Sequence, residues 1–255
     1  MSQPILLLAG KSYSTPIVYN SLREEFEIAA VVLEERVSRG EFLRRRIKKL
    51  GFAPVAGQAL FRALLVPYLK ASSKQRVAQI LVTHKLSTRP IPSENIQQVS
   101  SANSEDCIAV LKKTQPAAVV VNGTRILSNE VLKSISAPFL NMHAGITPLY
   151  RGVHGAYWAL VRRDRQNCGV TVHLVDPGID TGDVVAQARI EPTEFDNFAS
   201  YGYLQLAAGL PLLHQALRDA LRGRLEVRPA PVGNSQLWTH PTIVEYARNR
   251  CAGVK

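Results

Sequence analysis

Cysteine is scarce in this chain of 255 residues, in which Cys107, Cys168 and Cys251 lie far apart and form no CxxC pair. No disulfide framework is therefore indicated, and a reducing, cytoplasmic compartment is the default expectation. Long apolar runs are also lacking, since none approaches the roughly 18–20 residues that a membrane-spanning helix needs. The opening MSQPILLLAG has no basic stretch before its apolar run, so we expect no cleaved signal peptide. Apolar residues at 46% and charged residues at 20% exclude a disordered or low-complexity chain.

Acidic residues are almost missing from one part of the chain. Residues 36–76 hold eleven basic residues and a single acid, Glu41, whereas the whole chain carries a net charge of +11. The remainder is nearly neutral, which excludes a general polyelectrolyte binder. The segment is compatible with nucleic acid, an anionic membrane surface or a phosphorylated substrate, although a solvated helix face is the simplest interpretation. Few aromatic residues and no binding motif disfavour nucleic acid.

The apolar pattern predicts an α/β fold, Rossmann-like, with a mainly parallel sheet. A strand over 5–9, a helix and a second strand over 28–33 form a βαβ unit, and further strands are predicted over 117–121, 138–142, 169–175 and 184–190. Between them, residues 39–81 carry apolar residues at helical spacing, interrupted by Pro54 and Pro67. We expect two or three short amphipathic helices there, then a long helix over 197–221 and a terminal helix over 242–250.

Two familiar motifs fail on spacing. Gly10, Lys11 and Ser12 resemble the end of a P-loop, but Ile5 stands where that motif needs its first glycine. What remains is a strand–loop–helix start, which is either an anion site or a plain turn. The loop VDPGIDTGD holds three aspartates without the alternation of a calcium loop, so no metal site is predicted.

A short strand ends in the sequence PFLNMH, which places Asn141 and His143 two residues apart. Residues at this spacing point to the same side of an extended chain, and the carboxyl ends of strands are where open α/β sheets bind ligands. An amide donor and an imidazole, with a nearby carboxylate, suit acyl transfer to an amine, because they can stabilise an oxyanion and accept the proton of the amine. No GxSxG motif supports a covalent acyl-enzyme.

Three ordered stretches carry a resemblance to a known family: NGTRILS (122–128), FLNMHAGITPLYRG (139–152) and GVTVHLVDPGIDTGDVV (169–185). With them the sequence resembles the folate-dependent formyltransferases, which include glycinamide ribonucleotide formyltransferase, the catalytic domain of methionyl-tRNA formyltransferase and the sugar-nucleotide N-formyltransferases. The resemblance covers about residues 117–190. Together with the apolar pattern, it predicts a formyltransferase domain over 1–190, into which the basic helical segment at 36–81 is inserted, followed by a short helix-rich C-terminal extension at 191–255. The basic segment itself has no counterpart in the family.

The resemblance also implies roles for residues of this chain. The co-substrate would be 10-formyltetrahydrofolate, and Asn141, His143 and Asp180 would be catalytic. The residues expected at the folate site are Arg125, Ile126, Leu127, Val175, Asp176, Gly178 and Ile179. Those expected to bind the amine substrate are Gly10, Lys11, Ser12, Arg151 and His173, of which His173 could equally fill a strand position.

Departures from the family leave the acceptor open. The loop after His143 reads AGITP rather than SLLP, and the first loop lacks the Gly-Ser-Asn signature of the glycinamide enzyme. The tail after residue 190 lacks the strand density of the barrel domain that methionyl-tRNA formyltransferase uses for tRNA. An amino sugar on a nucleotide is the favoured acceptor, with glycinamide ribonucleotide, methionyl-tRNA, or hydrolysis of the formyl donor as alternatives. A non-catalytic anion-binding protein is the alternative of another class, and a homodimer is left open.

Overall fold

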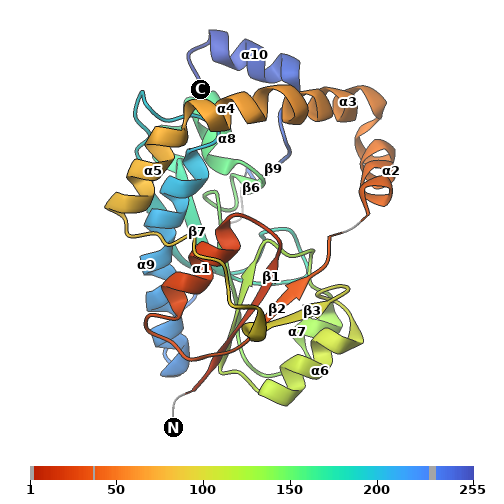
Figure 1. Cartoon of the computed structure of the whole chain (residues 1–255), viewed down its shortest axis with the longest axis vertical. Coiled ribbons are helices and arrows are strands. Elements are labelled where there is room, and N and C mark those ends of the chain that lie inside the picture. The colour runs from red at the N-terminus through yellow and green to blue at the C-terminus, as the bar shows by residue number, and fades with distance from the viewer. Residues whose placement is uncertain (1–2, 37, 230–233) are drawn as a thin grey trace.

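The computed structural model describes residues 3–36, 38–229 and 234–255. Its centre is a seven-stranded sheet in the order β3-β2-β1-β4-β5-β7-β8, and β6 and β9 form a second, small sheet (Figure 1). The strands β3, β2, β1, β4 and β5 run parallel, whereas β7 is antiparallel to β5 and β8 is antiparallel to β7. The predicted Rossmann-like α/β fold is therefore confirmed.

The described strands are β1 (Ile5–Gly10), β2 (Ile28–Glu34), β3 (Ile96–Val99), β4 (Ala118–Asn122), β5 (Phe139–His143), β6 (Arg151–Gly152), β7 (Gly169–Leu174), β8 (Val184–Arg189) and β9 (Leu237–Trp238). The described α-helices are α1 (Ser14–Leu22), α2 (Arg39–Leu50), α3 (Phe52–Leu60), α4 (Val66–Ser72), α5 (Lys74–Thr83), α6 (Glu105–Thr114), α7 (Asn129–Leu132), α8 (Gly155–Val161), α9 (Tyr201–Leu221) and α10 (Ile243–Cys251). Short turns of other helix types are η1 (Phe61–Leu65), η2 (Ser93–Asn95) and η3 (Arg165–Asn167).

The central strands β1 and β4 are buried on both faces because helices cover both sides of the sheet, toward which the side chains point alternately. On β1, Ile5 and Leu7 pack toward α1 and α9, while Leu6 and Leu8 pack toward α6 and α7. The helix α9 contributes Leu213 and other buried residues to the first of these clusters, so residues 191–255 share a core with the rest of the chain. Beyond the sheet, a third cluster of mainly aromatic side chains joins α8, α9, α10 and η1.

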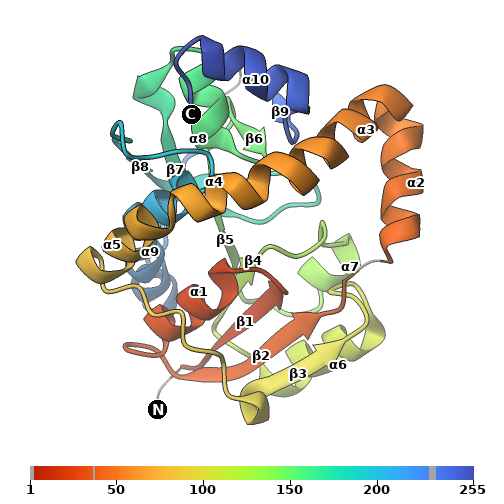
Figure 2. The same cartoon turned by 45° about the horizontal axis from the view of Figure 1, so that its top comes forward.

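The basic insertion consists of α2, a long helix and α5. The elements α3, η1 and α4 join end to end into one helix, which in Figure 2 runs diagonally across the molecule from α5 to α2. The expected break at Pro67 is wrong, because a π-turn precedes it and the N–H of Val66 donates to the carbonyl of Phe61. This local widening relieves the clash that a proline causes in an α-helix.

The joined helix also corrects the expectation that no segment is long and apolar enough to span a membrane. Phe52–Ser72 spans 21 residues at a mean hydropathy of 1.3, which by length and composition alone would allow it to cross a membrane. Its buried side holds Phe61 and Leu69, which pack in the aromatic cluster with Phe198 and Tyr246. One face of the helix is therefore fixed to the globular domain.

Two smaller expectations meet different outcomes. A helix was expected at the C-terminus, and α10 begins there with a complete capping box between Thr242 and Glu245. The sequence also predicts an edge strand over 224–227, but the described structure has there only an isolated bridge between Val184 and Arg228. The segment crosses β8 at one point and does not pair along it.

Candidate active site

A cavity of about 580 Å³ opens at the carboxyl ends of β4 and β5. Parallel sheets bind ligands at this edge because the loops that follow the strands meet there. The cavity is lined by Arg46, Val121, Asn122, Gly123, Thr124, Arg125, Ile126, Leu127, Asn141, Met142, His143, Ala144, Gly152, Val153, His173, Val175, Asp176, Gly178, Ile179, Asp180, Leu237, Trp238 and Thr239. All three predicted catalytic residues and all seven predicted folate-site residues are among them.

Asn141 and His143 lie two positions apart on β5, as the sequence predicted. The antiparallel strand β7 sets His173 directly opposite Asn141. Nδ2 of Asn141 lies 3.1 Å from Nε2 of His173, whose Nδ1 lies 2.7 Å from the carbonyl of Leu174. The contact of Nδ1 with that carbonyl fixes the ring of His173, whose Nε2 lies between the Asn141 amide and Oδ1 of Asp180. One amide N–H of Asn141 thus faces His173, and the other remains to donate.

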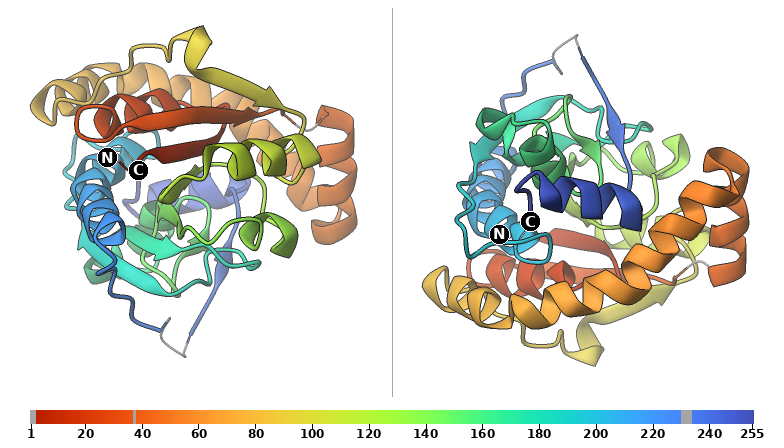
Figure 3. Two further views of the ribbon diagram at one scale, coloured as in Figure 1. Left: turned by 90° about the horizontal axis from the view of Figure 1, so that it is seen from below. Right: turned by 90° about the horizontal axis from the view of Figure 1, so that it is seen from above.

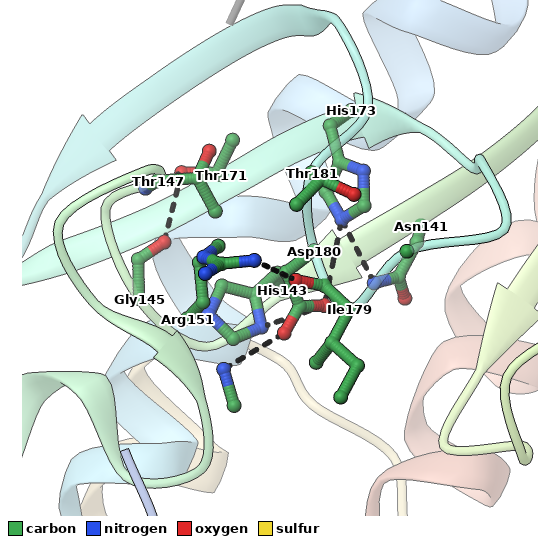
Figure 4. A network of polar contacts seen from close by, with 12 residues as sticks. Asn141, His143, Gly145, Thr147, Arg151, Thr171, His173, Ile179, Asp180 and Thr181 are labelled. Atoms are coloured by element: carbon green, nitrogen blue, oxygen red, sulfur yellow. Dashed lines mark hydrogen bonds and ion pairs between the residues drawn. The ribbon is translucent and has the colours of Figure 1, made fainter. Parts of the chain in front are cut away.

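Asp180 lies beside both imidazoles (Figure 4). Its Oδ1 is 3.3 Å from Nδ1 of His143 and 3.8 Å from Nε2 of His173, and its Oδ2 accepts a 2.8 Å hydrogen bond from the N–H of Gly152. Asp180 adopts a φ of +52°, a backbone conformation that is uncommon outside glycine and clusters at functional sites. The loop holds the carboxylate there against that conformational preference.

The imidazole of His143 lies between two acceptors. Its Nε2 is 2.7 Å from the carbonyl of Tyr150, and its Nδ1 faces Asp180. Burial lowers the pKa of His143, although Asp180 and the Tyr150 carbonyl act in the opposite direction. Burial by itself would raise the pKa of Asp180, but contacts with His173, His143 and the Gly152 N–H outweigh it, so its pKa is lowered. The pair therefore keeps an ionised carboxylate beside a ring that readily gives up its proton.

The loop after β5 is fixed closely to β7. Oγ1 of Thr171 donates to the carbonyl of Gly145 at 2.8 Å and accepts from the N–H of Thr147 at 3.1 Å (Figure 4). A Cβ atom on Gly145 would lie 2.8 Å from Nε2 of His143 and 2.3 Å from the carbonyl oxygen of Tyr150. The glycine that replaces the family's bulkier residue thus permits the close contact that orients His143.

One wall of the cavity is apolar and formed largely by backbone. Ile126 exposes half of its side chain there, whereas the Arg125 side chain turns away to the carbonyls of Glu35 and Ser100. On the other side, Asp176 receives hydrogen bonds from Thr181 Oγ1 and the Gly178 N–H, which shape the loop before Asp180. Asp176 is therefore a loop-forming residue at the edge of the cavity.

Four predicted substrate residues do not line the cavity. Gly10 packs against Gly123, where a Cβ atom would lie 2.3 Å from the carbonyl oxygen, so its role is to let two loops meet. Ser12 bonds to Ser14 and Thr15 within its own turn, and Lys11 accepts from Arg36 through its carbonyl. Arg151 donates to the carbonyl of Ile179 at 3.1 Å and thereby braces the loop before Asp180. His173 is the one predicted substrate residue in the lining.

Sequence reasoning missed two distant contributions to the cavity. The insertion brings Arg46, whose Nη2 donates to Oε1 of Gln58. The C-terminal segment brings Leu237, Trp238 and Thr239, because β9 pairs with β6. Neither carries a local motif that would have marked it. The net charge of +10 on residues 36–76 was a weak signal for the contribution of Arg46. Nothing in the sequence pointed to the contribution of the C-terminal segment.

Buried thiols and metal-binding clusters are two further kinds of reactive group to consider. Burial raises the pKa of Cys107 to about 11 and that of Cys168 to about 12, so neither thiol ionises near neutral pH. Within the described residues, no group of three or more His, Cys, Asp or Glu side chains is arranged to hold a metal ion. Asn141, His143 and Asp180 are the polar side chains that the cavity shares with the sequence prediction.

Comparisons with known proteins identify the family of this chain. A family model described as formyl transferase matches residues 67–202. A methionyl-tRNA formyltransferase from Caldanaerobacter subterraneus is 24% identical over 222 residues, which cover 87% of this chain and 60% of that protein. One from Microcystis aeruginosa is 33% identical over 127 residues, covering 50% of this chain and 38% of that protein. This chain spans about half the length of the curated relatives it matches.

Solved structures show the same fold. A sugar N-formyltransferase from a Shewanella species superposes with a TM-score of 0.57 at 13% identity, covering 92% of this chain and 76% of that one. A phosphoribosylglycinamide formyltransferase from Streptococcus pneumoniae gives 0.53 at 19% identity, covering 85% and 97% respectively. The family resemblance of the three sequence stretches is confirmed, since the model match takes in more than half of the residues and includes all three: this chain belongs to the formyl transferase family.

Proposed function

We propose that this protein transfers the formyl group of 10-formyltetrahydrofolate to a primary amine. The observation that carries the proposal is the convergence of Asn141, His143 and Asp180 on one cavity, with Nδ1 of His143 3.3 Å from Oδ1 of Asp180. The cavity suits a flat heterocycle, because the exposed side chain of Ile126 and the buried Leu127 form an apolar wall beside backbone groups. The formyl carbon would lie at the polar end, near β5.

The reaction then follows from the chemistry of these groups. The lone pair of the amine attacks the formyl carbon, and the second N–H of Asn141 donates to the oxygen that becomes negative. The ammonium formed on the amine gives a proton to Asp180, directly or through water. The bond from carbon to N10 breaks, and N10 takes a proton from His143. Formylated amine and tetrahydrofolate leave, and the His143–Asp180 pair has passed on one proton.

The acceptor is proposed to carry a phosphate or other anion, with an amino sugar on a nucleotide as the first candidate. Arg46 supports this, because it is a basic residue in the lining of the cavity, where burial, together with the neighbouring charge of Arg62, lowers its pKa. Planar guanidinium groups bind phosphate in two-point contacts. Methionyl-tRNA is the second candidate, supported by the names of the curated relatives.

One experiment separates these candidates from each other and from a hydrolase. The protein is incubated with 10-formyltetrahydrofolate and, in turn, amino sugar nucleotides, glycinamide ribonucleotide and aminoacylated initiator tRNA. A mass increase of one formyl group on an acceptor, with release of tetrahydrofolate, identifies the substrate. Formate release without any amine identifies a hydrolase. Absence of both reactions, together with no affinity for reduced folates, would refute the proposal.

We also propose that the reaction takes place in the cytoplasm. The three cysteines are unpaired, and Cys107 and Cys168 are buried in separate clusters where no partner thiol is at hand. Free thiols persist in a reducing compartment. Localisation of the tagged full-length chain tests this directly, and recovery of all of it from a secreted fraction would contradict it.

A further inference from the structure

The long helix of the insertion exposes an apolar face. Leu60, Leu64 and Tyr68 follow one another at a spacing of four, which places them on one side of the helix, and they are 50%, 60% and 67% exposed. Phe52, at the start of the same helix, is 73% exposed. Isolated exposed apolar residues are ordinary, but a stripe of large ones along one helix marks an interaction surface.

The opposite face of this helix is fixed to the protein. Phe61 makes ring contacts with Phe198 and Tyr246 at centroid distances of 5.0 Å, and Val55 and Leu69 are buried. Insertion of the helix across a bilayer would break these contacts of Phe61 with Phe198 and Tyr246. Figure 3 shows the helix running along the outside of the molecule, and the exposed stripe and the buried contacts lie on different sides of it, as in a helix that lies along an interface.

Positive charge lies next to the apolar stripe. Helix α2 leads directly into α3, and its exposed cations are Arg44, Arg45, Lys48 and Lys49. The only carboxylate in residues 38–83 is Glu41, which forms an ion pair with Arg45. The long helix adds the exposed Lys70. Its other exposed cation, Arg62, lies two positions from both Leu60 and Leu64 and therefore on a different side of the helix from the stripe.

We propose that α2 and the exposed face of Phe52–Ser72 dock on an anionic lipid bilayer. The aliphatic stripe would enter the boundary between headgroups and acyl chains, with the aromatic rings of Phe52 and Tyr68 near its two ends, where such rings prefer to lie. The cations of α2 would contact lipid phosphates or carboxylates. Binding to RNA would use the cations but leave the apolar stripe in water, and self-association through the stripe would bring the same cations of two copies together.

The proposed surface adjoins the active-site cavity. Arg46 lines that cavity and lies on the same helix as Lys48 and Lys49. A bilayer bound to α2 would therefore lie next to the cavity mouth, and acceptors carried by the membrane surface would reach it. The docking proposal itself does not rest on the identity of the acceptor, and it is tested without any activity measurement.

The test is binding of the full-length protein to sedimented vesicles of phosphatidylcholine alone or with 30% phosphatidylglycerol, at several salt concentrations. We expect binding to the anionic vesicles and much less to the neutral ones, weakening as salt screens the cations. The double variant Lys48→Glu with Lys49→Glu should bind anionic vesicles at least about 30-fold more weakly, since each basic residue near such a surface contributes roughly a tenfold factor or somewhat less.

A matched control exists on the other face of the sheet. Lys112 and Lys113 are also adjacent, exposed lysines in the last turn of a helix, α6, which packs on the opposite side from α1 and α9. Lys112→Glu with Lys113→Glu changes the net charge by the same amount and should leave vesicle binding within about twofold of the wild type. Equal losses in both double variants would show a response to net charge alone and overturn the proposal.

The apolar stripe is tested separately. Leu60→Ser with Leu64→Ser should weaken binding at least about tenfold, because burial of two leucine side chains is lost, whereas Leu60→Met with Leu64→Met keeps the apolar area and should bind as the wild type does. Leu60 and Leu64 are exposed in the folded protein, and circular dichroism verifies that both double variants fold. Unchanged binding in the serine variant refutes the docking surface. A dimer in solution that the serine variant abolishes would also refute it. Tight binding to RNA without binding to anionic vesicles would refute it as well.

Discussion

The N–H of Gly152 donates to Oδ2 of Asp180 over 2.8 Å, and this bond ties the loop of Asp180 to β6. Gly152 pairs with Trp238 in the small sheet, and a Cβ atom on Gly152 would lie 2.3 Å from the Trp238 carbonyl oxygen. Trp238 in turn stacks on Trp158 at a centroid distance of 4.7 Å. The position of the catalytic carboxylate thus depends on residues near the end of the chain.

Gly152→Ala should therefore reduce turnover more than its cost in stability explains. The new methyl group would push β9 or the loop of Gly152 apart, and a catalytic group displaced by about 1 Å can lose about 100-fold in rate. We expect a 10- to 100-fold lower kcat, measured with saturating formyl donor and acceptor.

Gly223→Ala supplies the matched control. Gly223 also has a positive φ, +65°, but no atom lies within 4 Å of where its Cβ would be. That variant should lose about 1 kcal/mol of unfolding free energy from backbone strain and keep its kcat. If the two alanine variants lose turnover equally, the effect is general destabilisation and the link to Asp180 is wrong.

Replacing His143 tests the central assignment. His143→Ala removes the group that gives a proton to N10 and stabilises the oxyanion, so kcat should fall about 100-fold or more. The affinity for a reduced folate should change little, because the apolar wall at Ile126 and Leu127 is untouched. Titration of folate by fluorescence and turnover by tetrahydrofolate release give the two readouts. A variant with near-normal turnover would remove His143 from the reaction.

Arg46 and Arg44 offer a comparison within one helix. Arg46→Gln removes the guanidinium in the cavity, and we expect a 10- to 100-fold higher KM for a phosphorylated acceptor, since hydrogen bonds to charged groups contribute about 1.5–3 kcal/mol. The KM for the formyl donor should stay the same. Arg44→Gln removes an equal charge from an exposed position and should leave both constants unchanged. A rise in the donor KM would place Arg46 at the folate side of the cavity instead.

Stability should fall as the pH drops below about 6.5. Burial, with help from Arg62 and Arg46, lowers the pKa of His240 to about 4, and burial lowers the pKa of His154 well below its ordinary value. In the unfolded chain both rings protonate near pH 6.5, so between about 6.5 and 4 the unfolded state binds more protons and gains stability relative to the folded state. His240 alone should cost about 2 kcal/mol at pH 5 compared with pH 7.

Urea unfolding at pH 7, 6 and 5 measures this slope. His240→Gln keeps a polar group beside His154, to which the His240 ring is hydrogen-bonded at 2.8 Å, but cannot titrate, so its unfolding free energy should decline less over the same range. Asp180 and Asp196, whose pKa values are lowered, protonate below this pH range and therefore do not contribute to the slope. Parallel slopes for the wild type and the variant would contradict the assignment to His240.

Much of the site could be predicted because its signals are local. The two-residue period of a strand places Asn141 and His143 on one side whatever the rest of the chain does. The glycines and aspartates after β7 mark a shaped loop, and family resemblance rather than spacing identified Asp180 within it. The prediction of Gly10, Lys11 and Ser12 as substrate residues stays untested, because a loop after a strand looks the same in sequence whether it meets a ligand or, as at Gly10, packs against another loop at Gly123.

The sequence by itself determined which strands are buried, the polar side chains at the end of β5 and an acid-poor insertion, because each depends on residues close together in the chain. Only the tertiary structure decided that Pro67 continues a helix across a π-turn, that Arg46 reaches the cavity, and that β9 holds Gly152 against Asp180. These features depend on packing between segments far apart in sequence, where contact energies rather than local periodicity choose the partner.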